Sequence, residues 1–264
     1  MKWEFSDIEF KVLCNRYRQN RIPAPLVYTC RTRSEVEYEH QLAEANSRLL
    51  ERLPADFRTV FETLVRPDVA VFAQVWCDRE MKNPEKRFRI HGARRGHRAC
   101  MLTQSPGETI WHTSGFTLTE CEPDELPALL VSQLPAAEAA SGPDVPIVID
   151  SGQPEADYAP RPSAFDSFDE PDSARGLAFL SKPAEWTGGF KIRQVRSKYG
   201  PRGMTGKTLL WRDLPGDGRY LIELDELEMR AAGASAQRIA ERIGAGVSHV
   251  LEHMTARGEG EFDA

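Results

Sequence analysis

The amino-acid sequence predicts an α+β fold, with a central, mostly antiparallel sheet and helices packed against it. Apolar residues recur every three or four positions in several segments, which is the spacing of one helix face. Other segments are short, rich in β-branched and aromatic residues, and separated by turn residues such as Pro106-Gly107, as strands are. Because the connections between these segments are short, neighbouring strands are expected to run antiparallel. The 264 residues suffice for one extended domain or two lobes.

Helices are predicted near both ends of the chain. Residues 6–9 match a capping box, in which Ser6 and Glu9 bond each other's backbone amides, so a short helix is expected to begin there. Further helices are predicted over residues 34–53, 57–64, 124–134 and 163–182, the last broken at Pro171. Ser235 can cap the clearest helix. Its apolar stripe consists of Ile239, Ala240, Ile243, Val247, Val250, Leu251 and Met254.

Strands are predicted between these helices, in two groups. The predicted segments are residues 26–30, 69–76, 87–95, 99–104, 109–119, 188–198, 207–214 and 218–224. Residues 135–162 are rich in Pro, Ala, Ser and Gly, and only 145–149 has the pattern of an ordered segment, so this stretch is predicted to be a linker. The chain is therefore divided into an N-terminal half, residues 1–134, and a C-terminal half, residues 163–264.

The two halves share a weak sequence similarity. Phe88-Arg89-Ile90 with Arg94 matches Phe190-Lys191-Ile192 with Arg196, and a Pro-Gly turn follows the next strand in both halves. This is either an internal duplication or the chance likeness of two simple β-meanders. If it is a duplication, the two meanders can join into one sheet.

Composition argues against several classes of function. The net charge of −6 and pI near 5.6 disfavour nucleic acid as a partner, although Arg87 to Arg98 form a local basic cluster that leaves a nucleic-acid adaptor open. The sequence has no apolar stretch long enough for a membrane span and no signal-peptide pattern, so the expected location is the cytoplasm. The five cysteines form no CxxC pair, which argues against a zinc cluster or a disulfide framework.

Two motifs bear on catalysis. His249-Val250-Leu251-Glu252-His253 has the H-x-x-E-H pattern, in which two histidines one helical turn apart hold zinc, and this leaves a metal-dependent hydrolase as the alternative function. Catalytic zinc needs a third protein ligand, and no His or Cys follows His253, so we interpret the two histidines as polar residues on the solvent-facing side of a helix end.

Residues 201–208 resemble a phosphate-binding loop but lead into a strand pattern, so a glycine-rich hairpin connection is expected. No catalytic, metal or cofactor residue is therefore assigned.

Several segments, taken in order, resemble the EspG family of ESX (type VII) secretion-associated proteins. They are Trp3-Glu4-Phe5, Ile22-Pro23-Ala24-Pro25-Leu26, Gly92-Ala93-Arg94-Arg95-Gly96, Pro106-Gly107-Glu108-Thr109-Ile110-Trp111, Ala164-Phe165-Asp166-Ser167-Phe168, Thr187-Gly188-Gly189-Phe190, Trp211-Arg212-Asp213-Leu214 and Asp217-Gly218-Arg219-Tyr220. None of them is a chemical fingerprint, so the resemblance rests on their order and spacing. It implies a central antiparallel sheet flanked by helical subdomains with a quasi-two-fold relation, so that both halves form one EspG-like domain.

The resemblance also implies a function. Members are cytosolic chaperones that bind PE/PPE heterodimers and keep them soluble for export, without a cofactor and without catalysis. They bind chiefly through a loop between two early strands and through the C-terminal helical subdomain. In this sequence the loop residues are Asp78, Arg79, Glu80, Met81, Lys82 and Asn83, of which Met81 is an adaptable apolar side chain suited to a protein interface. A homodimer formed through a strand edge or a helix face stays open as well.

Overall fold

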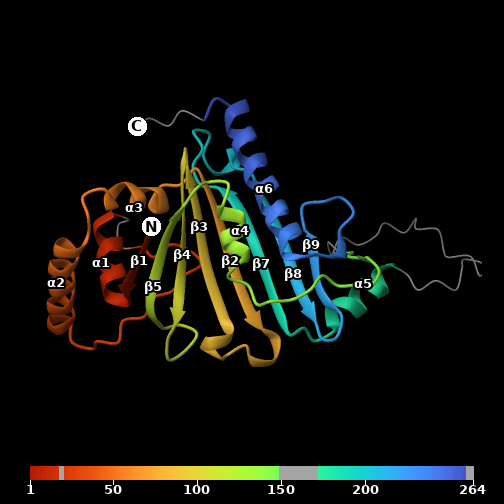
Figure 1. The fold of residues 1–264 in the computed structure, drawn as a ribbon, viewed down its shortest axis with the longest axis horizontal. Coiled ribbons are helices and arrows are strands. Elements are labelled where there is room, and N and C mark those ends of the chain that lie inside the picture. Colours follow the sequence, from red (N-terminus) through yellow and green to blue (C-terminus); the bar gives the residue numbers. More distant parts are fainter. Residues whose placement is uncertain (18–20, 149–171, 260–264) are drawn as a thin grey trace, which may run out of the picture.

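The computed structural model describes residues 1–17, 21–148 and 172–259. Its strands form a single ten-stranded sheet in the order β1-β5-β4-β3-β2-β7-β8-β9-β10-β6, and neighbouring strands are antiparallel throughout (Figure 1). The strands are β1 Lys2–Ser6, β2 Val69–Cys77, β3 Arg87–Arg95, β4 Arg98–Pro106, β5 Thr113–Cys121, β6 Val145–Pro146, β7 Trp186–Gln194, β8 Gly206–Leu214, β9 Gly218–Glu223 and β10 Arg230–Gly233. The predicted α+β class with a central antiparallel sheet is confirmed.

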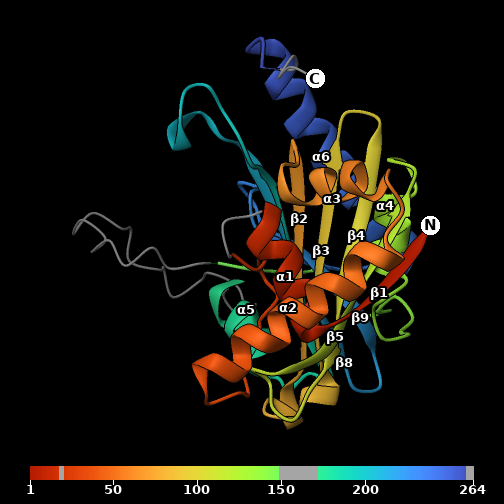
Figure 2. The ribbon, with the colours of Figure 1, turned by 90° about the vertical axis from the view of Figure 1, so that its left-hand side faces the viewer.

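Helices cover both faces of this sheet (Figures 1 and 2). They are α1 Asp7–Tyr17, α2 Glu35–Arg52, α3 Phe57–Val65, α4 Leu126–Val131, α5 Asp172–Ser181 and α6 Ala236–Ala256. On β4, Met101 packs in the same core cluster as α4 and α6, whereas the next residue, Leu102, packs with α1 to α3. Because successive side chains of a strand point to opposite faces, these two helix groups lie on opposite sides of the sheet. Helix α5 packs near β9 and β10, on the face away from α6.

The helix starts show that local sequence signals decide where these elements begin. The Ser6 hydroxyl accepts a hydrogen bond from the Glu9 amide at 3.2 Å, and the Glu9 carboxylate accepts one from the Ser6 amide at 3.0 Å, so the capping box is confirmed. Ser34 and Ser235 cap α2 and α6 in the same way, through the amides of Glu37 and Arg238.

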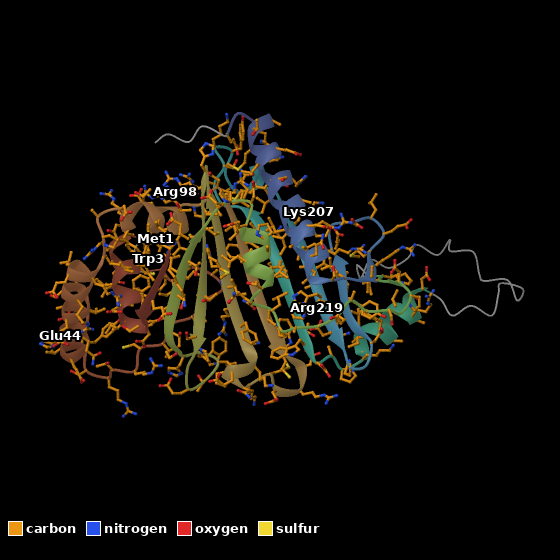
Figure 3. The ribbon with its side chains drawn as sticks, in the orientation of Figure 1. Met1, Trp3, Glu44, Arg98, Lys207 and Arg219 are labelled. Atoms are coloured by element: carbon orange, nitrogen blue, oxygen red, sulfur yellow. The ribbon has the colours of Figure 1, made fainter. Side chains whose placement is uncertain are left out.

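A buried ion pair lies in the C-terminal part of the sheet. Arg219, which is 1% exposed, donates two hydrogen bonds of 2.7 Å to the two carboxylate oxygens of Asp213. Its guanidinium lies 4.4 Å from the ring centroid of Trp211, and it donates a third bond to the Pro135 carbonyl. The position of Arg219 within the sheet can be followed in Figure 3. A bidentate pair of this kind fixes β8 against β9 and holds the backbone at Pro135 beside them.

The predicted linker contributes contacts to the sheet in its described part. Ala139 forms a bridge with Arg219, and β6 pairs with β10 through Val145 and Pro146. Residues 149–162 of the predicted linker lie outside the described residues, as do residues 163–171 of the predicted helix. The division of the chain into two halves and a linker stays a prediction.

Some predicted elements are wrong. Residues 26–30 have no regular structure, and residues 109–112 form a turn that precedes β5 instead of belonging to it. Three strands were not predicted, β1, β6 and β10. All three are short, and the first lies directly against the start of α1, so none shows a run of alternating apolar residues long enough to recognise.

The sheet order is symmetric about its centre. Strands β2 to β5 extend to one side of the central β2–β7 pair and β7 to β10 to the other, and each set begins after one helix and ends before another. The sequence match, however, relates β3 to β7, whereas the symmetric order relates β2 to β7. The internal duplication is therefore not confirmed. The sheet ends at β1 and β6, and pairing of a second copy at either edge stays a prediction.

Candidate partner-binding surface

The predicted loop joins β2 to β3 and is held in shape by its own polar residues. The Asn83 side chain donates to the Glu80 carboxylate at 2.8 Å and accepts from the Glu85 amide at 3.0 Å. The Lys86 ammonium lies 3.9 Å from the other carboxylate oxygen of Glu80 and 5.6 Å from the Trp186 ring. These bonds form two short 3-10 turns, Asp78–Glu80 and Pro84–Lys86, so the loop has a defined conformation.

The six predicted loop residues divide into two kinds. Asp78, Glu80 and Asn83 make hydrogen bonds or ion pairs within the protein. Arg79, Met81 and Lys82 form the exposed tip: Arg79 lies in the first turn, Met81 and Lys82 follow it, and Met81 is 52% exposed. Burying this exposed thioether against an apolar surface of a partner would favour binding.

Helix α5 adds a second set of exposed apolar residues, which sequence reasoning did not identify. Phe179 is buried against Tyr220 with ring centroids 5.1 Å apart, so this side of α5 faces the sheet. Leu177 and Leu180 are 67% and 43% exposed. A helix that carries three large apolar residues within four positions cannot bury them all on one face, and this was the signal available in the sequence.

Arg212 joins α5 to the loop. Its guanidinium donates to the carbonyls of Phe179 at 2.8 Å, Leu180 at 2.9 Å and Lys182, which are at the C-terminal end of the helix. The same guanidinium lies 3.7 Å from the carboxylate of Asp78, which also accepts from the Ala184 amide at 3.3 Å. One buried cation therefore positions the first residue of the loop and the last turn of α5 together. We call residues 78–86 and 172–182 the loop–α5 surface.

The H-x-x-E-H histidines have structural partners. His253 Nε2 lies 3.1 Å from the Gly203 carbonyl and His249 Nε2 lies 3.5 Å from the Thr205 hydroxyl, so both contact the loop between β7 and β8. Within the described ranges, no three side chains of His, Cys, Asp or Glu gather in a way that could hold a metal ion. The pair thus packs the β7–β8 loop on α6, and the metal-dependent hydrolase receives no support.

The phosphate-loop resemblance is explained by a hairpin connection, as predicted. Residues Pro201–Gly203 form one 3-10 turn and β8 begins at Gly206, so Lys207 and Thr208 lie in a strand rather than at the start of a helix.

His112 lies in the turn before β5, where its Nδ1 is 2.8 Å from the Thr109 hydroxyl.

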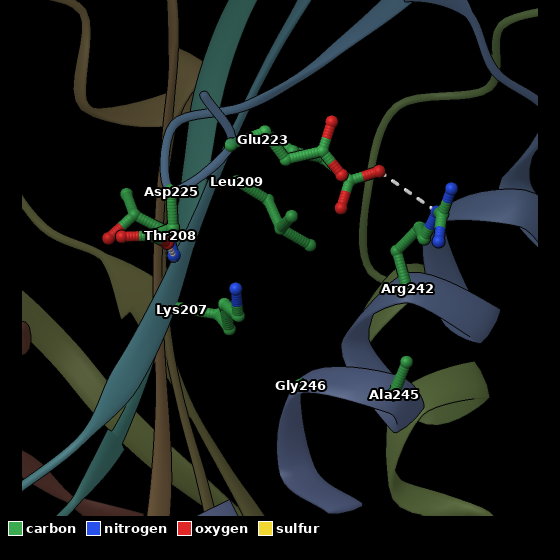
Figure 4. A pocket seen from close by; sticks show the side chains of 9 residues that line it. Lys207, Thr208, Leu209, Glu223, Asp225, Arg242, Ala245 and Gly246 are labelled. Carbon is green, nitrogen blue, oxygen red and sulfur yellow. Dashed lines mark hydrogen bonds and ion pairs between the residues drawn. The ribbon is translucent and has the colours of Figure 1, made fainter. Parts of the chain in front are cut away.

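A cleft of about 210 Å³ lies between β8, β9 and α6 (Figure 4). Small-molecule sites usually enclose about 300–1,000 Å³. Across the cleft, Arg242 Nε contacts a Glu223 carboxylate oxygen at 2.9 Å, and Asp225 accepts from the Thr208 amide. Burial raises the pKa of Glu223, against the opposing effect of the Arg242 charge. Arg242 and Glu223 are thus paired with each other across a cleft smaller than most ligand sites, and we assign it no ligand.

In the part of the chain that the structure covers, no helix is both long and apolar enough to cross a membrane. The ten-stranded antiparallel sheet with helices on both faces defines an α+β protein. The sequence matches the EspG family model over residues 6–245. The chain therefore belongs to the EspG family.

The fold is similar to that of a solved member of this class. The structure of the Mycobacterium tuberculosis type VII secretion system chaperone EspG5, in complex with the PE25-PPE41 dimer, superimposes with a TM-score of 0.56. The match covers 96% of this chain and 96% of that chain, at 14% sequence identity, and at this identity it establishes the fold. No curated protein sequence matches the chain at the significance threshold. The resemblance noted in the sequence is thus confirmed at the level of family and fold.

Proposed function

We propose that the chain is a cytoplasmic, non-enzymatic chaperone of type VII secretion that binds a PE/PPE-type heterodimer and keeps it soluble for export. Membership of the EspG family and the shared fold with EspG5, which was solved with a PE25-PPE41 dimer, support this function. The observation that carries it is the loop–α5 surface, because Met81, Leu177 and Leu180 are exposed large apolar side chains on two elements joined by Arg212.

The proposed contact works by burial of apolar area. The loop tip and α5 present thioether and leucine side chains to the apolar tip of the PPE-type partner, and each fully covered side chain contributes about 1.5–3 kcal/mol. Arg79 and Lys82 border Met81 and remain at the polar rim, where charged side chains affect specificity more than affinity. The six predicted loop residues thus contribute in two ways: three contact the partner and three hold the loop.

Co-expression with candidate PE/PPE pairs tests the proposal. The tagged chain is purified and the complex is measured by size exclusion and mass spectrometry, with a stable 1:1:1 assembly as the expected result. The variants Met81→Glu and Leu177→Glu should each lower the captured amount by about tenfold, because a carboxylate cannot be covered by an apolar surface without loss of hydration.

Leu50→Glu is the matched control, because Leu50 is 64% exposed on α2 and lies outside the loop–α5 surface. Equal capture by all three variants would remove the loop–α5 surface from the interface. Absence of any assembly with every pair offered would contradict the chaperone function itself.

A further inference from the structure

The opposite end of the sheet carries a concentration of positive charge. We call this the basic end and define it as residues 66–68, 94–98, 195–205 and 253–259. It has eight cationic side chains and two carboxylates, although the whole chain has a net charge of −6. The cationic residues are Arg66, Arg94, Arg95, Arg98, Arg196, Lys198, Arg202 and Arg257. Figure 3 shows Arg98 at this end of the sheet, and Figure 1 shows the C-terminal end of α6 there.

Hydrogen bonds and an ion pair join these segments into one surface. Asp68 accepts from the Gly96 amide at 2.9 Å and lies 3.4 Å from the Arg196 guanidinium, so it links the β3–β4 turn to the end of β7. Glu259 accepts from the Gln194 side chain at 2.6 Å and from the Ser197 hydroxyl at 2.7 Å, which links the β7–β8 loop to the end of α6. Both carboxylates of the basic end are therefore occupied by structural contacts.

Carboxylates from neighbouring elements neutralise part of the charge. Glu120 lies 3.0 Å from Arg98, and Glu62 lies 3.9 Å from Arg95 while also pairing with Arg58. Exposed Glu252 lies five residues before Arg257, in the last turns of α6. Exposed Arg66 and Arg202 have no ion pair with any residue in the described ranges, and Lys198 donates only to the Gly258 carbonyl at 3.3 Å. The basic end therefore keeps an excess of positive charge with open donor positions.

The β7–β8 loop also presents apolar side chains beside these cations. Tyr199 is 53% exposed and Met204 is 38% exposed. The Arg257 guanidinium lies 4.4 Å from the centroid of the Tyr199 ring, which holds the ring in place. Gly203 permits this compact loop, because a Cβ atom there would lie 2.5 Å from the Ser197 hydroxyl. Exposed Tyr, Met and Arg on a preformed loop are the composition of a protein-binding hot spot.

We infer that the basic end is a second docking surface, which binds an acidic protein segment carrying apolar or aromatic side chains. Arg202 and Lys198 would pair with its carboxylates, and Tyr199 and Met204 would cover its apolar side chains. The surface lies at the end of the strands opposite the β2–β3 loop, so it is distinct from the loop–α5 surface. A long polyanion such as nucleic acid fits less well, because the chain beyond this end is strongly acidic and repels an extended phosphate backbone.

The test uses the intact chain without other partners, so its result is separate from the test of heterodimer capture. A short fluorescein-labelled peptide of Asp, Glu and Phe residues is titrated with the protein, and fluorescence anisotropy is measured at low and high salt. Saturable binding that weakens with salt is expected. The double variant Lys198→Glu, Arg202→Glu should bind the peptide at least about tenfold more weakly, because reversing two charges changes the net charge at the contact by four units.

The double variant Arg33→Glu, Arg230→Glu is the matched control, with the same charge change at exposed positions outside the basic end. It should bind the peptide like the unmodified chain. Equal weakening in both double variants would overturn the inference, because only net charge would then matter, and so would the absence of saturable binding. Preferential binding of a single-stranded oligonucleotide of the same net charge would replace the acidic protein with nucleic acid as the ligand.

Discussion

The two ends of the sheet expose different chemistry on the same scaffold. The loop–α5 surface has five cationic side chains and four carboxylates, so it is nearly neutral, and its exposed apolar residues come from a helix and a loop tip. The basic end has eight cationic side chains and two carboxylates, with one exposed tyrosine and one exposed methionine among them. A buried polar side chain holds each end in shape: Arg212 donates hydrogen bonds at one, and Glu259 accepts them at the other.

This difference shows how one sheet can separate two kinds of recognition. Association through the nearly neutral surface depends on apolar area and is expected to change little with salt. Association through the basic end depends on charge, which salt screens within about 10 Å at moderate ionic strength. The length of the strands separates the two ends, so a ligand bound at one end leaves the other accessible. Substitutions that destabilise the whole protein should have the largest effect, substitutions that act on one end a smaller one, and cysteine labelling away from both ends the smallest.

The largest effect is expected from Asp213→Ala, which leaves buried Arg219 without its carboxylate. Removing one partner of a buried ion pair costs about 3–5 kcal/mol, because an uncompensated charge stays in the core. The free energy of unfolding, measured by chemical denaturation, should fall by this amount, and both ends should lose binding together. Glu226→Ala removes an exposed carboxylate and serves as the control. An unchanged free energy of unfolding for Asp213→Ala would contradict the role of this pair.

Arg212→Met should affect the loop–α5 surface alone. The substitution removes the hydrogen bonds to two carbonyls of α5 and to that of Lys182 just after it, and bonds to charged groups contribute about 1.5–3 kcal/mol each in favourable cases. Backbone amides of α5 should exchange hydrogen faster, and heterodimer capture should weaken, while binding of the acidic peptide stays constant. Lys191→Met, at an exposed position on β7, is the control. Unaltered exchange in α5 would show that the helix does not depend on Arg212.

Some of these features could be predicted from the sequence and others could not. Local signals that act within one element were readable, and the serine cap of α6 and the capping box of α1 lie where they were predicted. Strands β2 to β5 and β7 to β9 were found because alternation and turn residues are also local. Strands β1, β6 and β10 were missed because they are too short to show a period, and the apparent strand at residues 26–30 takes no place in the sheet.

The candidate sites depend more on contacts between distant segments. The β2–β3 loop was found through the family resemblance, but the separation of its residues into anchors and tip needs the position of Arg212, which lies far along the sequence. Leu177 and Leu180 look like ordinary core residues in the sequence, and only the packing of Phe179 decides which of the three is buried. The histidines at 249 and 253 suggested zinc because the sequence does not reveal the loop that contacts them.

A smaller effect, confined to the basic end, is expected from Glu259→Ala. The change leaves the buried Gln194 side chain without one acceptor, and a neutral or charge-assisted hydrogen bond contributes about 1–2 kcal/mol to stability. Thermal unfolding should begin at a lower temperature, and capture of the heterodimer should not change. Ser197→Ala removes only one of the two bonds to Glu259, so its effect should be about half as large. A loss of capture in Glu259→Ala would mean that the two ends are coupled.

Alkylation of cysteine should produce the smallest effect. Cys30 is exposed, whereas Cys14, Cys77 and Cys100 are buried. Burial, with Glu125 and Glu122 nearby, raises the pKa of the Cys121 thiol to about 11, so little of the reactive thiolate exists at neutral pH. Mass spectrometry after brief iodoacetamide treatment should find label on Cys30 first, with stability and both binding activities unchanged. Equally fast labelling of Cys77 would contradict its buried position.

The central pairing of β2 with β7 has a consequence for how the chain folds. Val69 pairs with Gln194 and Cys77 with Trp186, so the pairs at the middle of the sheet join residues more than a hundred positions apart, whereas the pairs of β3 with β4 and of β8 with β9 are hairpins. Hairpins form in about 1–10 μs, and pairings of high sequence separation form later because a long loop must close first. During synthesis the first meander therefore leaves the ribosome with the open edge of β2 exposed, and it waits for β7 to be made before that edge is covered.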